Sequence, residues 1–270
     1  MTPFQPNPPV ALTIAGSDNS AGAGIQADLK TFSHFGVYGL TAVTCVVAEV
    51  PERVTSIQSI ETRIISEQIA LSLGHFPVTA LKTGMLFSAE IIHAVVQTLK
   101  THASSIPIVV DPVMVATSGD SLLQTDAVDA MRNELFPIAT LITPNLDEAA
   151  ALLDGQKITS VNAMELAAKT LSARFGTAVL LKGGHLAGPT AIDLLVINDH
   201  IWTYETPFLD AISTHGTGCT LSAAITAQLA CGHNLPDAVR AAKSYITEAI
   251  RQSFHWNSPE KTSALNHFPN

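Results

Sequence analysis

Positive charge and cysteine are both scarce in this sequence. Its 270 residues include 14 Lys and Arg against 23 Asp and Glu, which gives a formal net charge of −9. A nucleic-acid-binding surface needs a basic patch, so this balance argues against a nucleic-acid partner. The three cysteines, Cys45, Cys219 and Cys231, are odd in number and too few for a disulfide framework. We therefore expect reduced thiols and a cytoplasmic location.

Long apolar runs are also missing. No unbroken apolar stretch approaches the ~20 residues of a membrane-spanning helix, and residues 1–9 lack the basic start and apolar core of a signal peptide. We expect neither a membrane segment nor a secretion signal. The pattern Gly-x-x-x-x-Gly-Lys-Ser/Thr is absent as well, which excludes a P-loop. Because 47% of the residues are hydrophobic and only 14% are charged, the chain can bury a sizeable core.

The sequence instead alternates short apolar strands with helical periodicity. Residues 10–15 read as a buried strand, and an apolar helical repeat begins at Ile25. Such alternation predicts an α/β fold with a mostly parallel sheet that helices cover on both faces. Because no linker or repeat is visible, we expect one domain over residues 1–270, with tails at 1–9 and 256–270.

Capping residues predict where several helices begin. Thr143 is expected to cap one helix, and Asn162 is expected to begin the next in a capping-box-like pair with Glu165. Two long helices are expected near the end of the chain, over residues 217–231 and 236–254.

The segment 214–219, Thr-His-Gly-Thr-Gly-Cys, leads into the first of these long helices. Its two glycines allow close approach of a ligand, and the first-turn N–H groups and the helix dipole favour an anion. A phosphoryl group in transfer needs such a cradle, because alignment and charge stabilisation do most of the catalytic work. Cys219 lies in the first helical turn, where a thiolate is stabilised. The alternative is an ordinary glycine-rich turn with a small buried cysteine.

Further polar segments follow predicted strands. Residues 16–24 form a loop rich in Gly and Ser but without dinucleotide-binding spacing, while Asp111, Asn145 and Lys182 lie at the ends of later strands. Carboxylates suit Mg²⁺ and a lysine suits phosphate. Glu148 can equally serve only to stabilise a helix N-terminus. Their joint position at strand ends favours a nucleotide and metal site.

Eight segments, in this order and spacing, carry a resemblance to a known family. They are residues 11–18, 22–32, 82–86, 111–116, 118–120, 143–145, 182–186 and 214–219. On these segments the chain resembles the hydroxymethylpyrimidine/phosphomethylpyrimidine kinases of the ribokinase-like group. The resemblance implies a three-layer α/β/α fold with a central, mainly parallel sheet, and often a homodimer. It also implies two ATP- and Mg²⁺-dependent phosphorylations in thiamine biosynthesis, of 4-amino-5-hydroxymethyl-2-methylpyrimidine and then of its monophosphate.

The same resemblance implies roles for individual residues. It places a catalytic anion hole at Gly216, Thr217, Gly218 and Cys219, a pyrimidine pocket at Gly16, Asp18, Glu49, Met85 and Val113, an ATP site at Asn145, Lys182, Thr214 and Lys243, and a metal site at Asp111 and Glu148. The Cys219 thiol would lie beside the substrate hydroxyl. A thiol acts as a base only if its pKa is lowered, and the helix N-terminus predicts such lowering.

Three positions depart from the family pattern, of which Ala21 in place of the usual Gly is the mildest. Glu49 stands where a Gln usually contacts the pyrimidine edge, and a carboxylate cannot donate a hydrogen bond unless it is protonated. Thr117 stands where a Lys is common, which removes a cation near the phosphorylated second substrate. Pyridoxal/pyridoxine kinase of the same group is the nearest alternative. A non-catalytic ligand sensor and a dehydrogenase are further alternatives, disfavoured by the retained polar residues and by the glycine spacing at 22–24.

Overall fold

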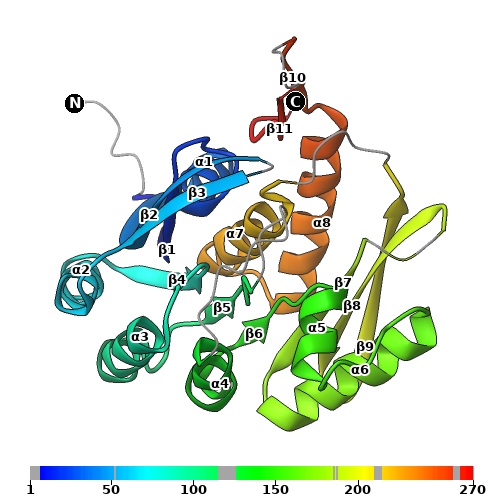
Figure 1. The fold of residues 1–270 in the computed structure, drawn as a ribbon, viewed down its shortest axis with the longest axis horizontal. Coiled ribbons are helices and arrows are strands. Elements are labelled where there is room, and N and C mark those ends of the chain that lie inside the picture. Colours follow the sequence, from blue (N-terminus) through cyan, green and yellow to red (C-terminus); the bar gives the residue numbers. More distant parts are fainter. Residues whose placement is uncertain are drawn as a thin grey trace.

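The computed structural model describes residues 7–51, 53–114, 126–184, 186, 188–209, 215–257 and 262–269. Within these residues most strands form one large sheet in the order β3-β2-β1-β4-β5-β6-β7-β8-β9 (Figure 1). Their bounds are β1 Val10–Asp18, β2 Tyr38–Val50, β3 Arg53–Ser59, β4 Val78–Thr83, β5 Ile108–Val110, β6 Leu141–Ile142, β7 Ala178–Gly183, β8 Thr190–Ile197 and β9 His200–Pro207.

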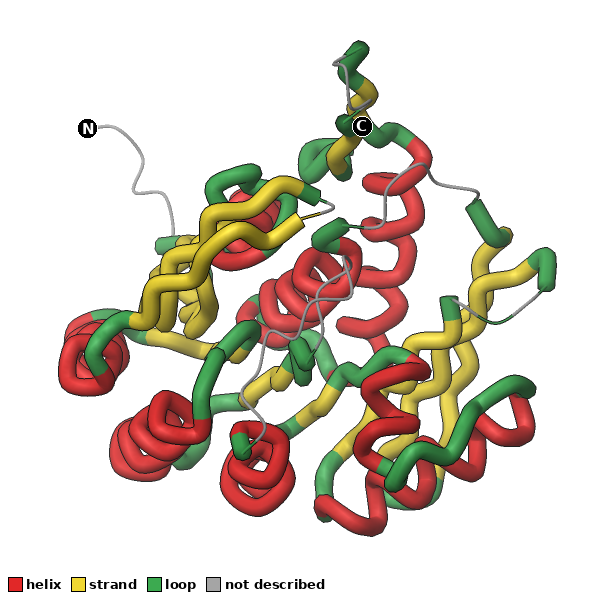
Figure 2. The backbone as a smooth tube through the Cα atoms, viewed as in Figure 1, coloured by secondary structure: helices red, strands yellow, loops and turns green. Residues whose placement is uncertain are grey.

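The centre of this sheet is parallel and its two edges are antiparallel. Neighbouring strands from β2 to β7 run parallel, whereas β3 and the β8–β9 hairpin run antiparallel to their neighbours. The turn of that hairpin has positive φ at both Asn198 and Asp199, as a two-residue turn with the right twist requires. Figure 2 shows the two antiparallel hairpins at opposite ends of the sheet. The carboxyl ends of the parallel strands therefore meet along one edge between them.

Helices cover both faces of the sheet (Figure 1). On one face lie α1 Gly24–His34, α7 Thr217–Ala230 and α8 Leu235–Arg251. On the other lie α2 Thr62–His75, α3 Ala89–His102, α4 Ala127–Ala130, α5 Leu146–Leu152 and α6 Val161–Phe175, with a π-helical turn at Met131–Leu135 and a 3₁₀ turn at Phe136–Ile138 after α4. Apolar clusters fill the space between the sheet and each helix layer. This arrangement confirms the three-layer α/β/α prediction. Among the described helices, none combines the length and apolar character needed to cross a bilayer.

The start of α5 differs from the prediction. Its N-cap is Asn145, whose side chain accepts a hydrogen bond from the Glu148 N–H at 2.8 Å, while the Glu148 carboxylate accepts one from the Asn145 N–H at 2.8 Å. This reciprocal pair is a capping box. Thr143 is buried instead, and its hydroxyl donates to Asp111 at 3.1 Å. The predicted cap at Thr143 is therefore wrong, because the hydroxyl has a tertiary partner.

The start of α6 also differs. Ser160 is its N-cap and accepts a hydrogen bond from the Ala163 N–H at 3.2 Å, so Asn162 lies inside the helix. Ser and Asn are comparable N-cap residues, so composition alone did not distinguish the two positions.

The end of the chain folds back onto the molecule. Helix α8 ends at Arg251, earlier than predicted, and β10 (Phe254–His255) pairs with β11 (Ser263–Ala264). Beyond β11, the Tyr245 hydroxyl donates to the carbonyl of His267 at 2.8 Å. The described part of the segment that the sequence placed in a tail thus packs against α8.

Candidate active site

The N-terminus of α7 lies at the carboxyl end of the parallel strands. Gly216 is its N-cap with φ +79°, and a Cβ at this position would lie 1.8 Å from the carbonyl oxygen of Gly22. Only glycine fits there, in both conformation and space. The first turn of α7, Thr217 to Cys219, lines a cavity of about 830 Å³, and the N–H groups of a first turn point toward the N-terminal end of their helix. This end of α7 has the geometry expected of an anion site.

A buried ion pair lies directly against that helix end. The Lys182 ammonium is 3.1 Å from Oδ1 of Asp111, and a Cβ added to Gly218 would be 3.3 Å from the ammonium and 3.6 Å from Oδ2 of Asp111. Burial opposes ionisation of Asp111, but the charges of Lys182 and Lys82 outweigh it and hold the pKa of that carboxyl below its ordinary value. Asp111 is therefore a carboxylate at neutral pH.

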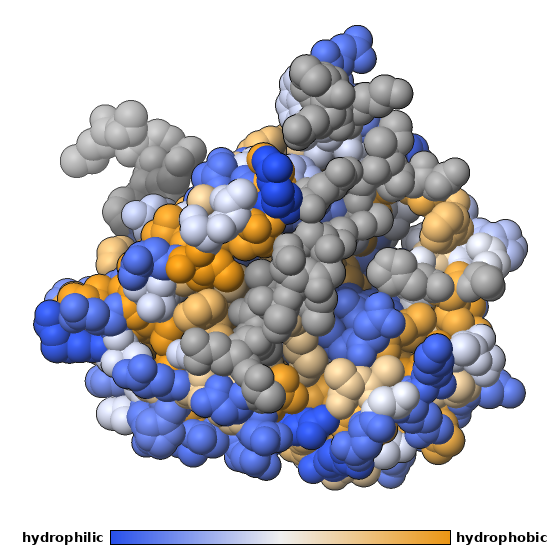
Figure 3. Space-filling model, viewed as in Figure 1, coloured by the Kyte–Doolittle hydropathy of each residue, from blue (hydrophilic) through white to orange (hydrophobic). Residues whose placement is uncertain are grey.

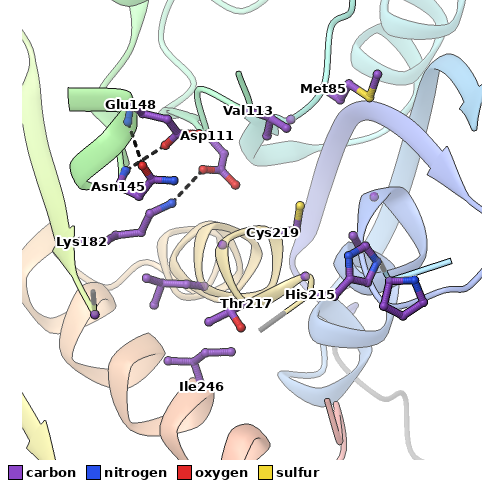
Figure 4. Close-up of a pocket in the computed structure, with 18 of the residues that line it drawn as sticks. Met85, Asp111, Val113, Asn145, Glu148, Lys182, His215, Thr217, Cys219 and Ile246 are labelled. Carbon is purple, nitrogen blue, oxygen red and sulfur yellow. Dashed lines mark hydrogen bonds and ion pairs between the residues drawn. The ribbon is translucent and has the colours of Figure 1, made fainter. Parts of the chain in front are cut away.

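A second carboxyl group approaches from α5. The capping box with Asn145 holds Glu148 in place. The backbone of Asn145 in turn forms an isolated parallel β-bridge with that of Lys182. Burial raises the pKa of Glu148; the Lys182 ammonium counteracts this effect and the Asp111 carboxylate adds to it. Figure 4 shows these four side chains together at the left of the view, Val113 and Met85 farther to the right, and Cys219 at the edge of α7 below Val113. The cavity thus has a charged half and a more apolar half.

The more apolar half contains the residues expected to contact a pyrimidine. Gly16, Met85 and Val113 line it, and a Cβ at Gly16 would lie 2.9 Å from the Cys45 sulfur, which leaves no room for a side chain. Glu49 lines the same half, and burial, reinforced by the nearby Asp18 charge, raises the pKa of its carboxyl to about 7. This half therefore offers a carboxyl group that can change protonation state near neutral pH.

Cys219 does not have the electrostatics that the sequence predicted. Burial raises the pKa of its thiol to about 12, and the Lys82 charge and a hydrogen bond from the Gly24 N–H offset only part of this. The predicted lowering is wrong because the cost of desolvating a thiolate exceeds the benefit of the helix N-terminus. The thiol is neutral at physiological pH.

Of a further ion pair in the cavity wall, between Lys243 and Asp193, the sequence predicted the lysine and missed the aspartate. The Lys243 ammonium lies 2.6 Å from Oδ2 of Asp193, and Oδ1 of Asp193 accepts a hydrogen bond from the Gly183 N–H at 3.0 Å. Lys243 lines the cavity, yet its charge is already balanced by Asp193. No sequence motif marked Asp193, because it is a single charged residue within an otherwise largely apolar strand of a hairpin. Thr214 lies outside the described residues.

Beneath the site lies a third ion pair, which sequence reasoning did not identify. Lys82 and Asp28 are both fully buried, with 2.7 Å between the ammonium and Oδ1, and the Thr13 hydroxyl donates to Oδ2 at 2.6 Å. The available signal was a charged residue within the apolar strand β4. Apart from Thr214, the structure brings every predicted site residue to the wall of the one cavity.

Comparison with known proteins agrees with this geometry. Residues 18–263 match the family model described as phosphomethylpyrimidine kinase. The hydroxymethylpyrimidine/phosphomethylpyrimidine kinase of Rhizobium meliloti is 44% identical over 96% of this chain and 97% of its own, and the pyridoxine kinase of Bacillus subtilis is 43% identical over 94% and 96%.

Solved structures give the same result. An ADP complex of Bacillus subtilis pyridoxal kinase superposes with a TM-score of 0.87 at 40% identity, covering 97% of this chain and 98% of its own. Phosphomethylpyrimidine kinase from Clostridium difficile superposes with a TM-score of 0.78 at 41% identity, covering 89% and 99%. The chain therefore belongs to the phosphomethylpyrimidine kinase family.

Proposed function

We propose that this chain transfers the terminal phosphoryl group of ATP to 4-amino-5-hydroxymethyl-2-methylpyrimidine and then to the monophosphate, in thiamine biosynthesis. The observation that carries the proposal is the position of Cys219. It joins the two halves of one cavity: the charged half around Lys182 and the more apolar half around Met85. An acceptor hydroxyl in the second half and a phosphate in the first would meet at the N-terminus of α7.

We place ATP along the charged half. Its phosphates would lie against the first-turn N–H groups of α7 and the Lys182 ammonium, since both provide preorganised positive charge. Its base would extend toward the apolar side chains of Ile246 and Leu221, which line the far end of the cavity beside Lys243. Because Lys243 is paired with Asp193, we assign it to shaping this end and not to direct neutralisation of phosphate.

Asp111 and Glu148 fit a magnesium site. Both offer carboxylate oxygens, which Mg²⁺ prefers, and both are buried beside the proposed phosphate position. The high pKa of Glu148 reflects an unfavourable negative charge, which a dication would relieve. Mg²⁺ held there would neutralise charge on the transferring phosphate.

The residues of this chain would act mainly by positioning and charge stabilisation. Phosphoryl transfer with a loose transition state asks little of a general base. We therefore assign the neutral Cys219 thiol to contact with the acceptor oxygen, and the N–H groups of Thr217 and Gly218 to the developing charge. Closing the cavity around both substrates would exclude water and so disfavour hydrolysis of ATP.

Pyridoxal/pyridoxine kinase is the second candidate function. The near-complete superposition on the Bacillus subtilis pyridoxal kinase favours it, and so does the Glu49 departure from the usual pyrimidine-reading residue. Incubating the enzyme with excess ATP and either alcohol, followed by separation of mono- and diphosphate products, tests both. We expect faster turnover of the pyrimidine and formation of its diphosphate; faster turnover of pyridoxal would contradict the assignment.

We also propose that the protein forms a homodimer and that it is located in the cytoplasm. On the face in Figure 3, apolar side chains gather over the β2–β3 hairpin, and Val46 and Val50 of β2 are exposed there. Such a patch is a candidate surface for a second copy of the chain. Light scattering on the purified protein would decide between one and two copies.

A further inference from the structure

Two loops from opposite ends of the sequence meet at the mouth of the cavity. One is the substrate loop, residues 16–24, which runs from the end of β1 to the start of α1, and the other is the anion loop, residues 215–219, which includes the first residues of α7. They are joined by Asp18 and His215, whose Oδ2 and Nε2 lie 3.1 Å apart. Both side chains are nearly buried, with relative exposures of 2% and 10%. The contact therefore links the substrate loop directly to the segment that begins α7.

Asp18 also organises the substrate loop itself. Its carboxylate accepts hydrogen bonds from the N–H groups of Ser20, Gly22 and Ala23, at 2.6, 3.1 and 2.8 Å. Burial opposes ionisation, but the hydrogen bonds from His215, Ser20 and Ala23 outweigh it and lower the pKa of Asp18 to about 2. One carboxylate thus fixes the backbone of its own loop and holds the anion loop through His215.

Close backbone contact makes the junction rigid. A Cβ at Gly22 would lie 2.7 Å from Cδ2 of His215, and one at Gly216 would lie 1.8 Å from the carbonyl oxygen of Gly22. Neither loop can shift toward the other. A movement of one loop must therefore either move the other loop as well or break the contact between them.

The same cluster could be read as a cation site. Ligand atoms of Asp18, Glu49 and His215 all lie within 4.8 Å of one another. However, Oδ2 of Asp18 already accepts from the Ser20 hydroxyl, two backbone N–H groups and His215. A cation would have to displace donors that hold the loop together, so the observations favour a structural link.

We propose that His215 is a positioning residue that couples the substrate loop to the anion loop, so that the acceptor alcohol and the nucleotide bind cooperatively. This proposal rests on the proposed function, because it needs the two substrates to occupy the two halves of the cavity. Coupling of this kind is reciprocal: each ligand raises the affinity for the other by the same factor.

Calorimetry can measure that factor. The dissociation constant of the Mg²⁺ complex of a non-hydrolysable ATP analogue is determined with and without saturating pyrimidine alcohol. We expect about tenfold tighter nucleotide binding with the alcohol in the native protein, and a factor near one in His215→Ala. His215→Gln, whose amide can donate to Asp18, should recover part of the coupling. His233→Ala, at an exposed histidine after α7, is the matched control and should keep the native factor.

Amide hydrogen exchange supplies a test that needs no ligand. In the free protein, His215→Ala should speed exchange across residues 18–24 several-fold relative to native and to His233→Ala, while exchange in β4 stays unchanged. Faster exchange throughout would indicate general destabilisation, and His215→Gln then decides: native-like exchange supports the link, and persistent loss overturns it. Unchanged exchange at 18–24, or undiminished coupling in His215→Ala, also overturns the proposal. Failure of the native protein to bind the alcohol contradicts the proposed function instead.

Discussion

The ammonium of Lys182 and the carboxylate of Asp111 form an ion pair, 3.1 Å apart, against the first turn of α7. Lys182 comes from the end of β7, and Asp111 follows β5, two strands away in the sheet. The pair thus places a cation and a potential metal ligand together beside the backbone that would hold the migrating phosphate.

Replacing Lys182 by Met should lower kcat by about 100-fold or more, because a preorganised charge is removed from the position where negative charge develops. Steady-state kinetics with the pyrimidine alcohol measures the effect. Lys169→Met is the matched control, since Lys169 forms a half-exposed pair with Glu165 on α6, away from the cavity. Thermal unfolding of both variants separates loss of charge from loss of structure. Native-like kcat in a folded Lys182→Met protein would remove this lysine from the mechanism.

The three cysteines should differ sharply in reactivity. Because the pKa of Cys219 lies near 12, its thiolate is nearly absent at pH 8, and buried Cys45 has a pKa raised to about 11. Exposed Cys231 should therefore be alkylated by iodoacetamide first, as measured by mass spectrometry of the labelled peptides. Cys231→Ala should reduce early labelling to background. Preferential labelling of Cys219 at pH 8 would restore the activated-thiol interpretation.

Local patterns in the sequence predicted the layers of the fold and the glycine-rich start of α7, whereas most of the other predicted site residues came from the family resemblance. The apolar run at β1 and the glycines at the start of α7 each act over a few residues. The missed features depend on packing between distant segments. Asp28 and Lys82 are 54 residues apart, and Asp193 and Lys243 are 50 apart. The pKa of Cys219 likewise depends on burial, which a helix-terminus argument does not contain.

Recognition of the pyrimidine should depend on pH through Glu49. Its pKa of about 7 is above the usual value, so the neutral acid predominates below pH 7 and the carboxylate above it. The neutral acid can accept from the amino group and donate to the adjacent ring nitrogen, whereas the carboxylate can only accept. We expect the affinity for the alcohol to fall as pH rises from 6 to 8, by about tenfold at most per pH unit.

Glu49→Gln separates this effect from titration of the ligand itself. Its amide offers the same donor and acceptor at every pH, so the variant should keep the native low-pH affinity, and any remaining pH dependence belongs to other groups. Calorimetric titration at pH 6, 7 and 8 gives the comparison. A total loss of affinity in Glu49→Gln would mean that the charge of Glu49 is required for binding.

Mutations in the buried pair of Lys82 and Asp28 should lower the free energy of unfolding far more than mutations in an exposed ion pair. Lys82→Met leaves the Asp28 carboxylate without its cation, and Asp28→Asn leaves the ammonium without its anion. Both side chains are fully buried, so each change should lower the free energy of unfolding by about 3–5 kcal/mol. Denaturant titration measures the loss. Arg63→Ala, which breaks an exposed pair with Glu67 on α2, should change it by less than about 1 kcal/mol.

The double replacement Lys82→Met with Asp28→Leu decides what the pair contributes. On one hypothesis, the pair contributes to stability only because each buried charge offsets the desolvation cost of the other. In that case, removing both charges should recover most of the free energy of unfolding that either single change loses. The Thr13 hydroxyl would then lose its acceptor, so adding Thr13→Val should recover about 1 kcal/mol more. A double variant as unstable as the sum of the single changes would contradict this reasoning. It would mean that the pair also fixes the packing of α1 against β4, which apolar side chains of similar size cannot replace.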